Sequence, residues 1–229
     1  MAKKKSRQPD NLQEIESALT QTEQFIEDNQ KIISYIISGI IVVVIAYLGF
    51  NKFYLQPRQA EAQSQMFMAE NYFEKDSFNL AINGDGNYLG FLDIIDSYGI
   101  TKSANLAKYY TGICYLHLGQ YEDAIEYLED FKTDDLLLAP VKEGTIGDIY
   151  VELGDYDKAL DQYRKAFNMN DNELTKPVYM QKAAALLESM DELEQALELY
   201  QRIKSEFPNS TEGGNADKYI ARIEVKLSQ

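Results

Sequence analysis

The sequence predicts an all-α protein in which a single N-terminal transmembrane helix is followed by an α-solenoid of repeated helix pairs. The first observation is an apolar run without a charge, from Ile32 to Phe50. The second is a pattern of small and large apolar residues that recurs three times within residues 105–210. Beyond the tail and the anchor, about 170 residues remain, which is enough for one domain with a substantial core.

The apolar run has the length and composition of a membrane-spanning helix. Nineteen residues at about 1.5 Å rise per residue give roughly 28 Å, close to the ~30 Å hydrocarbon core of a bilayer. Lys31 and Lys52 close the run. Aromatic residues near its ends favour the headgroup region, and these are Tyr35, Tyr47, Phe53 and Tyr54. We predict a transmembrane helix at residues 32–55, with a buried core helix as one alternative.

A cleaved signal peptide is the other alternative, because Ala60-Glu61-Ala62 satisfies the small-x-small cleavage rule. This site lies ten residues beyond the run, and 31 residues precede the run, too many for an ordinary signal-peptide n-region. We therefore expect the helix to be retained. The N-terminus is expected on the cytoplasmic side because of a distal basic cluster, Lys3, Lys4, Lys5 and Arg7.

Residues 1–31 form the predicted cytoplasmic tail. Residues 1–10 show no apolar period and are expected to be disordered. From Leu12 to Ile26 apolar residues recur at helical spacing, and Asp10 with Gln13 resembles a capping box, which predicts a short amphipathic helix. Such a helix can be solvated or can dock on another membrane protein, and the sequence does not choose between the two.

Residues 56–104 are predicted to be a degenerate N-terminal repeat with an inserted loop. We expect a helix at residues 60–76, a turn at 83–87 and a second helix at 88–98. The turn sequence Asn-Gly-Asp-Gly-Asn resembles part of a calcium loop. However, the Gly and Glu that such a loop needs are replaced by a tyrosine and an isoleucine, so we expect no calcium site.

Residues 105–210 contain three copies of one pattern. The first two copies are GICYLHLGQYEDAIEYLEDF (112–131) and GDIYVELGDYDKALDQYRKAF (147–167), which align at an offset of 35 residues. The third copy is AAALLESMDELEQALELYQRI (183–203), at a further offset of 37. Each copy reads as two helices joined by a tight turn, so these residues are predicted to form three helix pairs.

Small residues recur at equivalent places in the copies, and they are Gly112, Gly147 and Ala184 on the first helix and Ala124, Ala159 and Ala196 on the second. They let the two helices approach closely, while large residues fill the space between pairs. The turn glycines Gly119 and Gly154 are replaced by Asp191 in the third copy. With Pro208 at the closing position, the pattern resembles the tetratricopeptide repeat. The resemblance implies a solenoid, for which residues 211–229 are predicted to be a C-terminal capping helix starting at Ala216.

The predicted solenoid is acidic, with 31 Asp and Glu against 15 Lys and Arg from Ala60 onward. A domain with this charge repels nucleic acid and anionic lipid, so contact with the lipid bilayer is expected only through the one helix. The sequence contains no Gly-rich phosphate loop and no G-x-S-x-G. We expect no cofactor, no small-molecule substrate and no nucleic acid as partner.

Cys114 and His117 are the only thiol and the only imidazole in the chain. A catalytic dyad needs a hydrogen bond between the two groups and a third residue that orients the base, and a metal site needs further ligands. Cys114 stands at a repeat position that is usually turned into the helix pair, so we expect a small buried hydrophobic residue. We predict that the protein is not an enzyme; an enzyme or redox protein that uses these two residues is the alternative from another class.

A tetratricopeptide solenoid offers a concave surface lined by its first helices, and the resemblance places a protein-binding groove there. Its predicted residues are Leu106, Tyr109, Ile113, Leu116 and His117 in the first copy, Val141, Gly144, Asp148, Val151 and Glu152 in the second, and Val178, Gln181, Ala185, Glu188 and Ser189 in the third. Tetratricopeptide domains that hold chaperone C-termini carry Lys, Asn and Arg at these positions. Here the residues are apolar, neutral or acidic, so the groove is expected to prefer an apolar or basic segment. The alternative is an unoccupied groove, with contacts through the outer face or the anchor.

A short cytoplasmic tail, one membrane span and an acidic repeat domain of this size resemble the bacterial ancillary SecYEG translocon subunit family. The resemblance implies a bacterial inner-membrane protein whose repeat domain lies in the periplasm. It also implies a non-enzymatic partner of Sec translocon subunits and of a membrane-anchored periplasmic chaperone, which helps substrates that emerge from the channel. The main alternative is a tetratricopeptide scaffold for another cell-envelope assembly or secretion machine.

Overall fold

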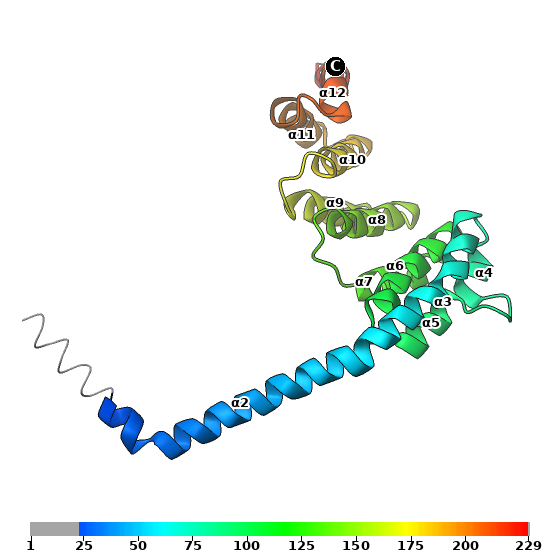
Figure 1. Ribbon diagram of the computed structural model, residues 1–229. Helices are drawn as coiled ribbons and strands as arrows, with labels where there is room; N and C mark the ends of the chain where they lie inside the picture. Colours follow the sequence, from blue (N-terminus) through cyan, green and yellow to red (C-terminus); the bar gives the residue numbers. More distant parts are fainter. Residues whose placement is uncertain (1–22, 229) are drawn as a thin grey trace, which may run out of the picture. The chain divides into compact units, whose positions relative to one another are not determined.

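The computed structural model describes residues 23–228. The chain consists of two compact units, Met1–Pro57 and Arg58–Gln229. Within the described residues every regular element is helical and no strand occurs (Figure 1). The all-α prediction is therefore confirmed.

The first unit contains the apolar helix α2 (Gln30–Phe50), which passes into a π-helical turn at Asn51–Leu55. Side chains on all sides of α2 are exposed. By length and composition it is the one helix among the described residues that is long and apolar enough to cross a membrane. The predicted amphipathic helix that starts at Leu12 lies mostly outside the described residues. Of the described residues in this region, 23–28 are helical.

The degenerate N-terminal copy consists of α3 (Gln56–Glu74), α4 (Phe78–Asn83) and α5 (Phe91–Tyr98). The sequence did not predict α4 as a separate helix. The predicted turn after it is closed by Asp85, whose carboxylate accepts hydrogen bonds from the Asn87 and Tyr88 amides and from the Tyr72 hydroxyl. Because these amides are held in the loop, α5 begins three residues later than the predicted helix at 88–98.

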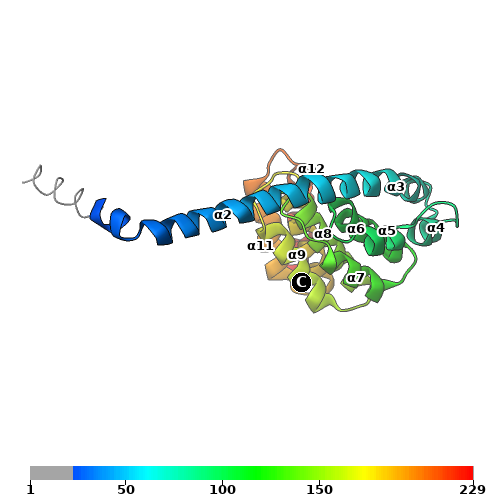
Figure 2. The ribbon, with the colours of Figure 1, turned by 60° about the horizontal axis from the view of Figure 1, so that its bottom comes forward.

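Three regular helix pairs follow, and they are α6 (Lys102–His117) with α7 (Tyr121–Asp130), α8 (Leu138–Glu152) with α9 (Tyr156–Asn168), and α10 (Lys176–Ser189) with α11 (Leu193–Glu206). The pairs succeed one another in space as they do in sequence, and α12 (Thr211–Leu227) follows the last of them (Figures 1 and 2). Helix α12 begins before the predicted Ala216, because the Ser210 side chain accepts a hydrogen bond from the Gly213 amide and caps an earlier turn.

The glycines and alanines that the sequence predicts between the two helices of each pair lie at these positions in the structure. A Cβ on Gly112 would be 2.6 Å from Leu128 Cγ, and one on Gly147 would be 2.7 Å from the Tyr163 ring. The four alanines of the set are fully buried. The pairs thus approach more closely than larger side chains would allow.

The tight turns within the pairs use left-handed backbone conformations. Gly119 has φ +71°, Gly154 has φ +75°, and Asp191 has φ +65°. Aspartate is one of the few L-residues that adopt this region at moderate cost. The third copy therefore keeps the turn after losing its glycine.

Buried apolar side chains form three clusters along the second unit. The first joins α3, α4, α5 and α6 and includes Cys114. The second lies between α7 and α8 and is made of Ala124, Leu128, Ile146 and Ile149. The third joins α9, α10, α11 and α12. Each helix pair is thereby packed against the next, as a solenoid requires.

Candidate protein-binding surface

The predicted groove residues lie on α6, α8 and α10, and they differ in how far neighbouring elements cover them. The partly buried members are Leu106, Tyr109, Ile113, Leu116, Val141, Asp148, Val151, Val178, Gln181 and Glu188. The exposed members are His117, Glu152, Ala185 and Ser189. Gly144 is buried. Contacts within the protein therefore decide which of them a partner can reach.

The predicted groove residues of α6 pack largely against the protein itself. The Tyr109 ring lies 5.3 Å from the ring of Phe131, which follows α7. Ile113 and Leu116 contact the cluster between α7 and α8, and Leu106 contacts the cluster of the first helices. These four side chains therefore help to join neighbouring helices.

His117 and Cys114 have separate environments. The His117 ring stacks on the Phe78 ring of α4, with centroids 4.6 Å apart and planes at 3°. Cys114 is fully buried, and burial raises the pKa of its thiol to about 12. Since the thiolate is the reactive form, this thiol is inert at neutral pH. The described residues contain no hydrogen bond between the two side chains, and their helix provides no dyad.

Asp148 of α8 is paired within the protein. Its carboxylate accepts a hydrogen bond of 2.7 Å from the Tyr163 hydroxyl and lies 2.6 Å from Lys182 Nζ. Burial, together with the hydrogen bond to Asp148, raises the pKa of Tyr163. The sequence prediction missed Lys182, although the spacing of 34 residues between the two partners is close to one repeat. The negative charge of Asp148 is thus largely compensated before any partner binds.

Glu188 of α10 is paired by the capping helix. Arg222 donates to its Oε2, and Lys226 Nζ lies 2.9 Å from its Oε1. Burial alone would raise the pKa of Glu188, but the hydrogen bonds from Lys226 and Arg222 outweigh burial and lower it. Helix α12 therefore covers this end of the predicted groove.

Gly144 is closed by an aromatic ring and not open to a partner. A Cβ at this position would overlap the ring of Tyr179 from α10. Tyr179 also lies 6.4 Å from Tyr163 in a stacked arrangement, and burial raises the pKa of Tyr179. The glycine is a packing position that lets α10 approach α8.

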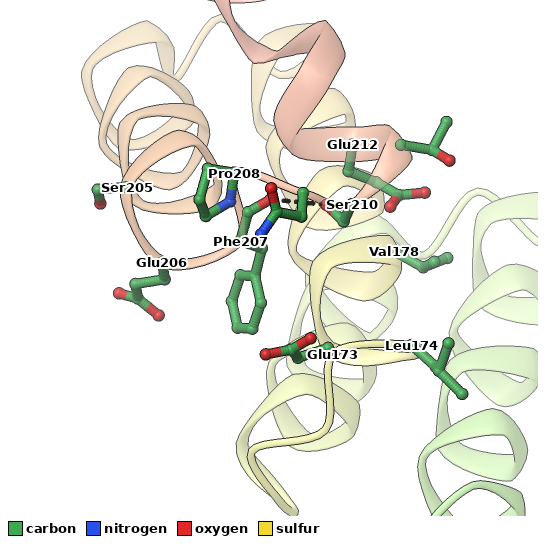
Figure 3. A pocket seen from close by; sticks show the side chains of 11 residues that line it. Glu173, Leu174, Val178, Ser205, Glu206, Phe207, Pro208, Ser210 and Glu212 are labelled. Atoms are coloured by element: carbon green, nitrogen blue, oxygen red, sulfur yellow. Dashed lines mark hydrogen bonds between the residues drawn. The ribbon is translucent and has the colours of Figure 1, made fainter.

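A surface that the sequence prediction missed lies where α10 begins and where α11 gives way to α12. It encloses a cavity of about 670 Å³ (Figure 3). We call this the edge surface, and define it by Leu136 and by the cavity residues Glu173, Leu174, Val178, Phe207, Pro208 and Glu212. Only Val178 belongs to the predicted groove. No sequence motif marks the cavity, because its residues come from two connecting loops that are separate in the sequence.

The helix pairs coincide with matches to a known repeat. Residues 106–135, 144–173 and 178–210 match tetratricopeptide-repeat families. These stretches contain most of α6 with α7, of α8 with α9 and of α10 with α11. The chain therefore contains tetratricopeptide repeats, as predicted. No curated protein matches the sequence.

Solved structures agree on the fold. Two crystal structures of a Podosopora anserina putative kinesin light chain with nearly identical TPR-like repeats, one of a single-residue variant, match with a TM-score of 0.57 at 12% identity. The matches cover 75% of this chain and 88% and 89% of those chains. The first TPR of Spaghetti (RPAP3), bound to an HSP90 peptide, covers 55% of this chain and 94% of its own, with 23% identity and a TM-score of 0.43.

Fold and repeats together define the class of protein. Tetratricopeptide repeats typically serve as non-catalytic scaffolds that bind other proteins. The chain is thus an all-helical interaction scaffold, with one apolar helix ahead of its repeats.

Proposed function

We propose that the chain is an ancillary subunit of the Sec translocon, which links the channel to a membrane-anchored periplasmic chaperone during protein export. The observation that carries the proposal is the combination of an exposed helix, α2, that is uncharged from Ile32 to Phe50, with tetratricopeptide repeats on one chain. Such a chain keeps a protein-binding domain close to a membrane machine. In this proposal α2 spans the bacterial inner membrane, the N-terminus is cytoplasmic and the repeats are periplasmic.

The charge and chemistry of the repeat domain support a role in binding proteins. Its excess of acidic residues disfavours nucleic acid and anionic lipid as partners. The buried, protonated Cys114 supports a non-enzymatic role. The proposed partners are translocon subunits and a chaperone, both reached from the periplasmic side.

Gentle crosslinking of the full-length chain in its membrane, followed by mild-detergent purification and mass spectrometry, tests the proposed partners. We expect translocon subunits and a periplasmic chaperone to be enriched. Enrichment of outer-membrane assembly or secretion components, with translocon subunits at background, would refute the Sec role and support the scaffold of another envelope machine.

Thiol labelling tests the proposed topology. Cys114 is fully buried, so a membrane-impermeant maleimide reports only on introduced cysteines. We expect Ser228→Cys to react in intact spheroplasts and Ser6→Cys to react only after permeabilisation. The reverse pattern would place the repeats in the cytoplasm.

The predicted groove is tested by combining Tyr109→Ala with Val151→Asp. We expect at least tenfold weaker partner binding, because an aromatic anchor is lost and a charge enters an apolar position. The matched control is Tyr156→Ala with Val225→Asp, since these side chains are 45% and 58% exposed on other helices. Circular dichroism establishes that both variants are folded. Equal binding by the two variants would move the contact away from the groove.

A further inference from the structure

Two asparagines hold one side of the edge surface in a defined shape. Asn170 and Asn172 donate hydrogen bonds of 3.0 and 3.3 Å to the Leu136 carbonyl, which joins the loop before α8 to the loop before α10. Asn172 also accepts a hydrogen bond of 3.0 Å from the Leu174 amide. The main chains of Leu136 and Leu174 are thus bound to one side chain, and the two loops form a single surface.

Apolar groups on this surface are left open to solvent. Leu136 is 66% exposed and Leu174 is 69% exposed. Figure 3 shows Leu174 and Val178 on one side of the cavity and Phe207 and Pro208 on the other. The cavity is lined by both polar and apolar groups, and the exposed Leu174 in its lining offers contact area to an apolar side chain of a partner.

Uncompensated negative charge borders the same surface. Glu173 and Glu212 line the cavity, and within residues 23–228 neither of them forms an ion pair. The third glutamate, Glu206, is paired with Arg202, and the nearby Lys176 is paired with Asp171. Two carboxylates therefore remain available to a cation from outside.

In the predicted groove, two of the three carboxylates are already paired, and only the exposed Glu152 has no ion pair within residues 23–228. There, Lys182 compensates Asp148, and Arg222 with Lys226 compensates Glu188. A basic partner gains less electrostatic binding energy from carboxylates that are already paired than from the unpaired Glu173 and Glu212. Electrostatic complementarity therefore favours the edge surface over the groove for a cationic segment.

We propose that the edge surface binds a segment of a partner protein in which leucine-like side chains alternate with lysine or arginine. The apolar side chains fill the cavity against Leu174 and Phe207, and the basic side chains pair with Glu173 and Glu212. An anionic membrane is a poor occupant, because the carboxylates repel it. This proposal deepens the role as an interaction scaffold and rests on it, but it does not depend on the identity of the membrane machine.

Fluorescence anisotropy tests the proposal with the full-length chain in nanodiscs of zwitterionic lipid, with empty nanodiscs as background. The probe is a short fluorescein-labelled peptide of leucine and lysine, and the comparison peptides contain leucine and glutamate or serine and lysine. We expect the leucine–lysine peptide to bind more tightly than both. Equal binding of the leucine–glutamate peptide, or no binding of the leucine–lysine peptide, would overturn the proposal.

Variants locate the binding site. Leu174→Ser is expected to weaken binding about tenfold, because most of a leucine contact is lost. Glu173→Gln with Glu212→Gln is expected to weaken binding about fivefold and to flatten its salt dependence. The matched controls are Leu153→Ser, an exposed leucine in another turn, and Asp157→Asn with Glu194→Gln, which are acidic residues in the first turns of α9 and α11. If the controls weaken binding as much, the surface is not specific and the proposal fails.

The two proposals fail in distinguishable ways. Tyr109→Ala with Val151→Asp leaves the edge surface intact, so peptide binding is expected to be unchanged in that variant. Loss of translocon crosslinks with normal peptide binding would refute the Sec role alone. Translocon crosslinks that persist while Leu174→Ser has no effect on the peptide would refute the edge surface alone.

Discussion

Two junctions between successive helix pairs occupy equivalent places in the repeat but are built from different side chains. Between the second and third pairs, Tyr163 of α9 stacks with Tyr179 of α10, and Lys182 of α10 pairs with Asp148 of α8. Between the first and second pairs, the fully buried side chains are the aliphatic Ala124, Leu128, Ile146 and Ile149, and tyrosines pack against them only as partly buried neighbours. The junction between the second and third pairs thus combines aromatic packing with a charge pair. The junction between the first and second pairs depends on a small apolar cluster.

The spacing of the repeats and the strength of the junctions between them therefore have separate origins. Spacing is set by the small residues inside each pair, which are alike in all three copies. The strength of a junction is set by the side chains that fill it, which are not alike. In a solenoid each pair contacts mainly its neighbours, so the weakest junction decides where unfolding begins. We expect this place to be the junction of α7 and α8.

The largest effect is expected from Leu128→Ala. Leu128 is fully buried, packs on Gly112 of α6 and belongs to the cluster that joins α7 to α8. Its truncation should destabilise the domain by about 3 kcal/mol and uncouple the first pair from the second. Hydrogen exchange of the full-length chain in detergent, read by mass spectrometry, should show α3–α7 opening before α8–α12. A single cooperative transition in this variant would contradict the proposed weak junction; Leu227→Ala, at an exposed leucine, is the control.

The next largest effect is expected from a substitution that adds one methyl group at the junction between the second and third pairs. Gly144→Ala places a Cβ against the Tyr179 ring, so α8 and α10 must separate, at a cost of about 2 kcal/mol. Gly214→Ala is the matched control, because no atom lies within 4 Å of a Cβ there and alanine is the better helix former. That substitution should stabilise α12 by about 0.5–1 kcal/mol. Urea unfolding compares the two, and changes of the same sign would contradict the close packing at Gly144.

Local and periodic features were the ones that the sequence could predict. The burial of Cys114, the small residues inside the pairs and the turn at Asp191 all follow from a residue and its neighbours within one repeat. The pairing of Asp148 with Lys182 was missed, because it depends on how one repeat is rotated onto the next. The edge surface was missed for a similar reason, since side-chain amides of one loop bind the main chain of another.

A smaller effect concerns the charge pairs of Glu188 with the capping helix. The folded-state pKa of Glu188 is lowered, so the carboxylate stabilises the protein above its ordinary pKa of about 4.3, and this contribution is lost as the pH falls through the folded value. Between about pH 5 and pH 3, wild type should therefore lose about 1 kcal/mol more stability than Glu188→Gln. Urea unfolding at several pH values measures this difference. Parallel pH profiles would show that Arg222 and Lys226 contribute nothing to the last junction.

The smallest effect compares equivalent turns in two copies. Asp191 and Gly154 have the same left-handed conformation, and the amide at each position donates to the carbonyl three residues earlier. Because glycine adopts this region without a Cβ penalty, Asp191→Gly should stabilise the third pair by about 0.5–1 kcal/mol, and Gly154→Ala should destabilise the second pair by about 1 kcal/mol. Thermal unfolding of both variants measures the two shifts. If Asp191→Gly is instead destabilising, the aspartate carboxylate contributes to the turn beyond its backbone conformation, and the third copy differs from the others by more than the loss of a glycine.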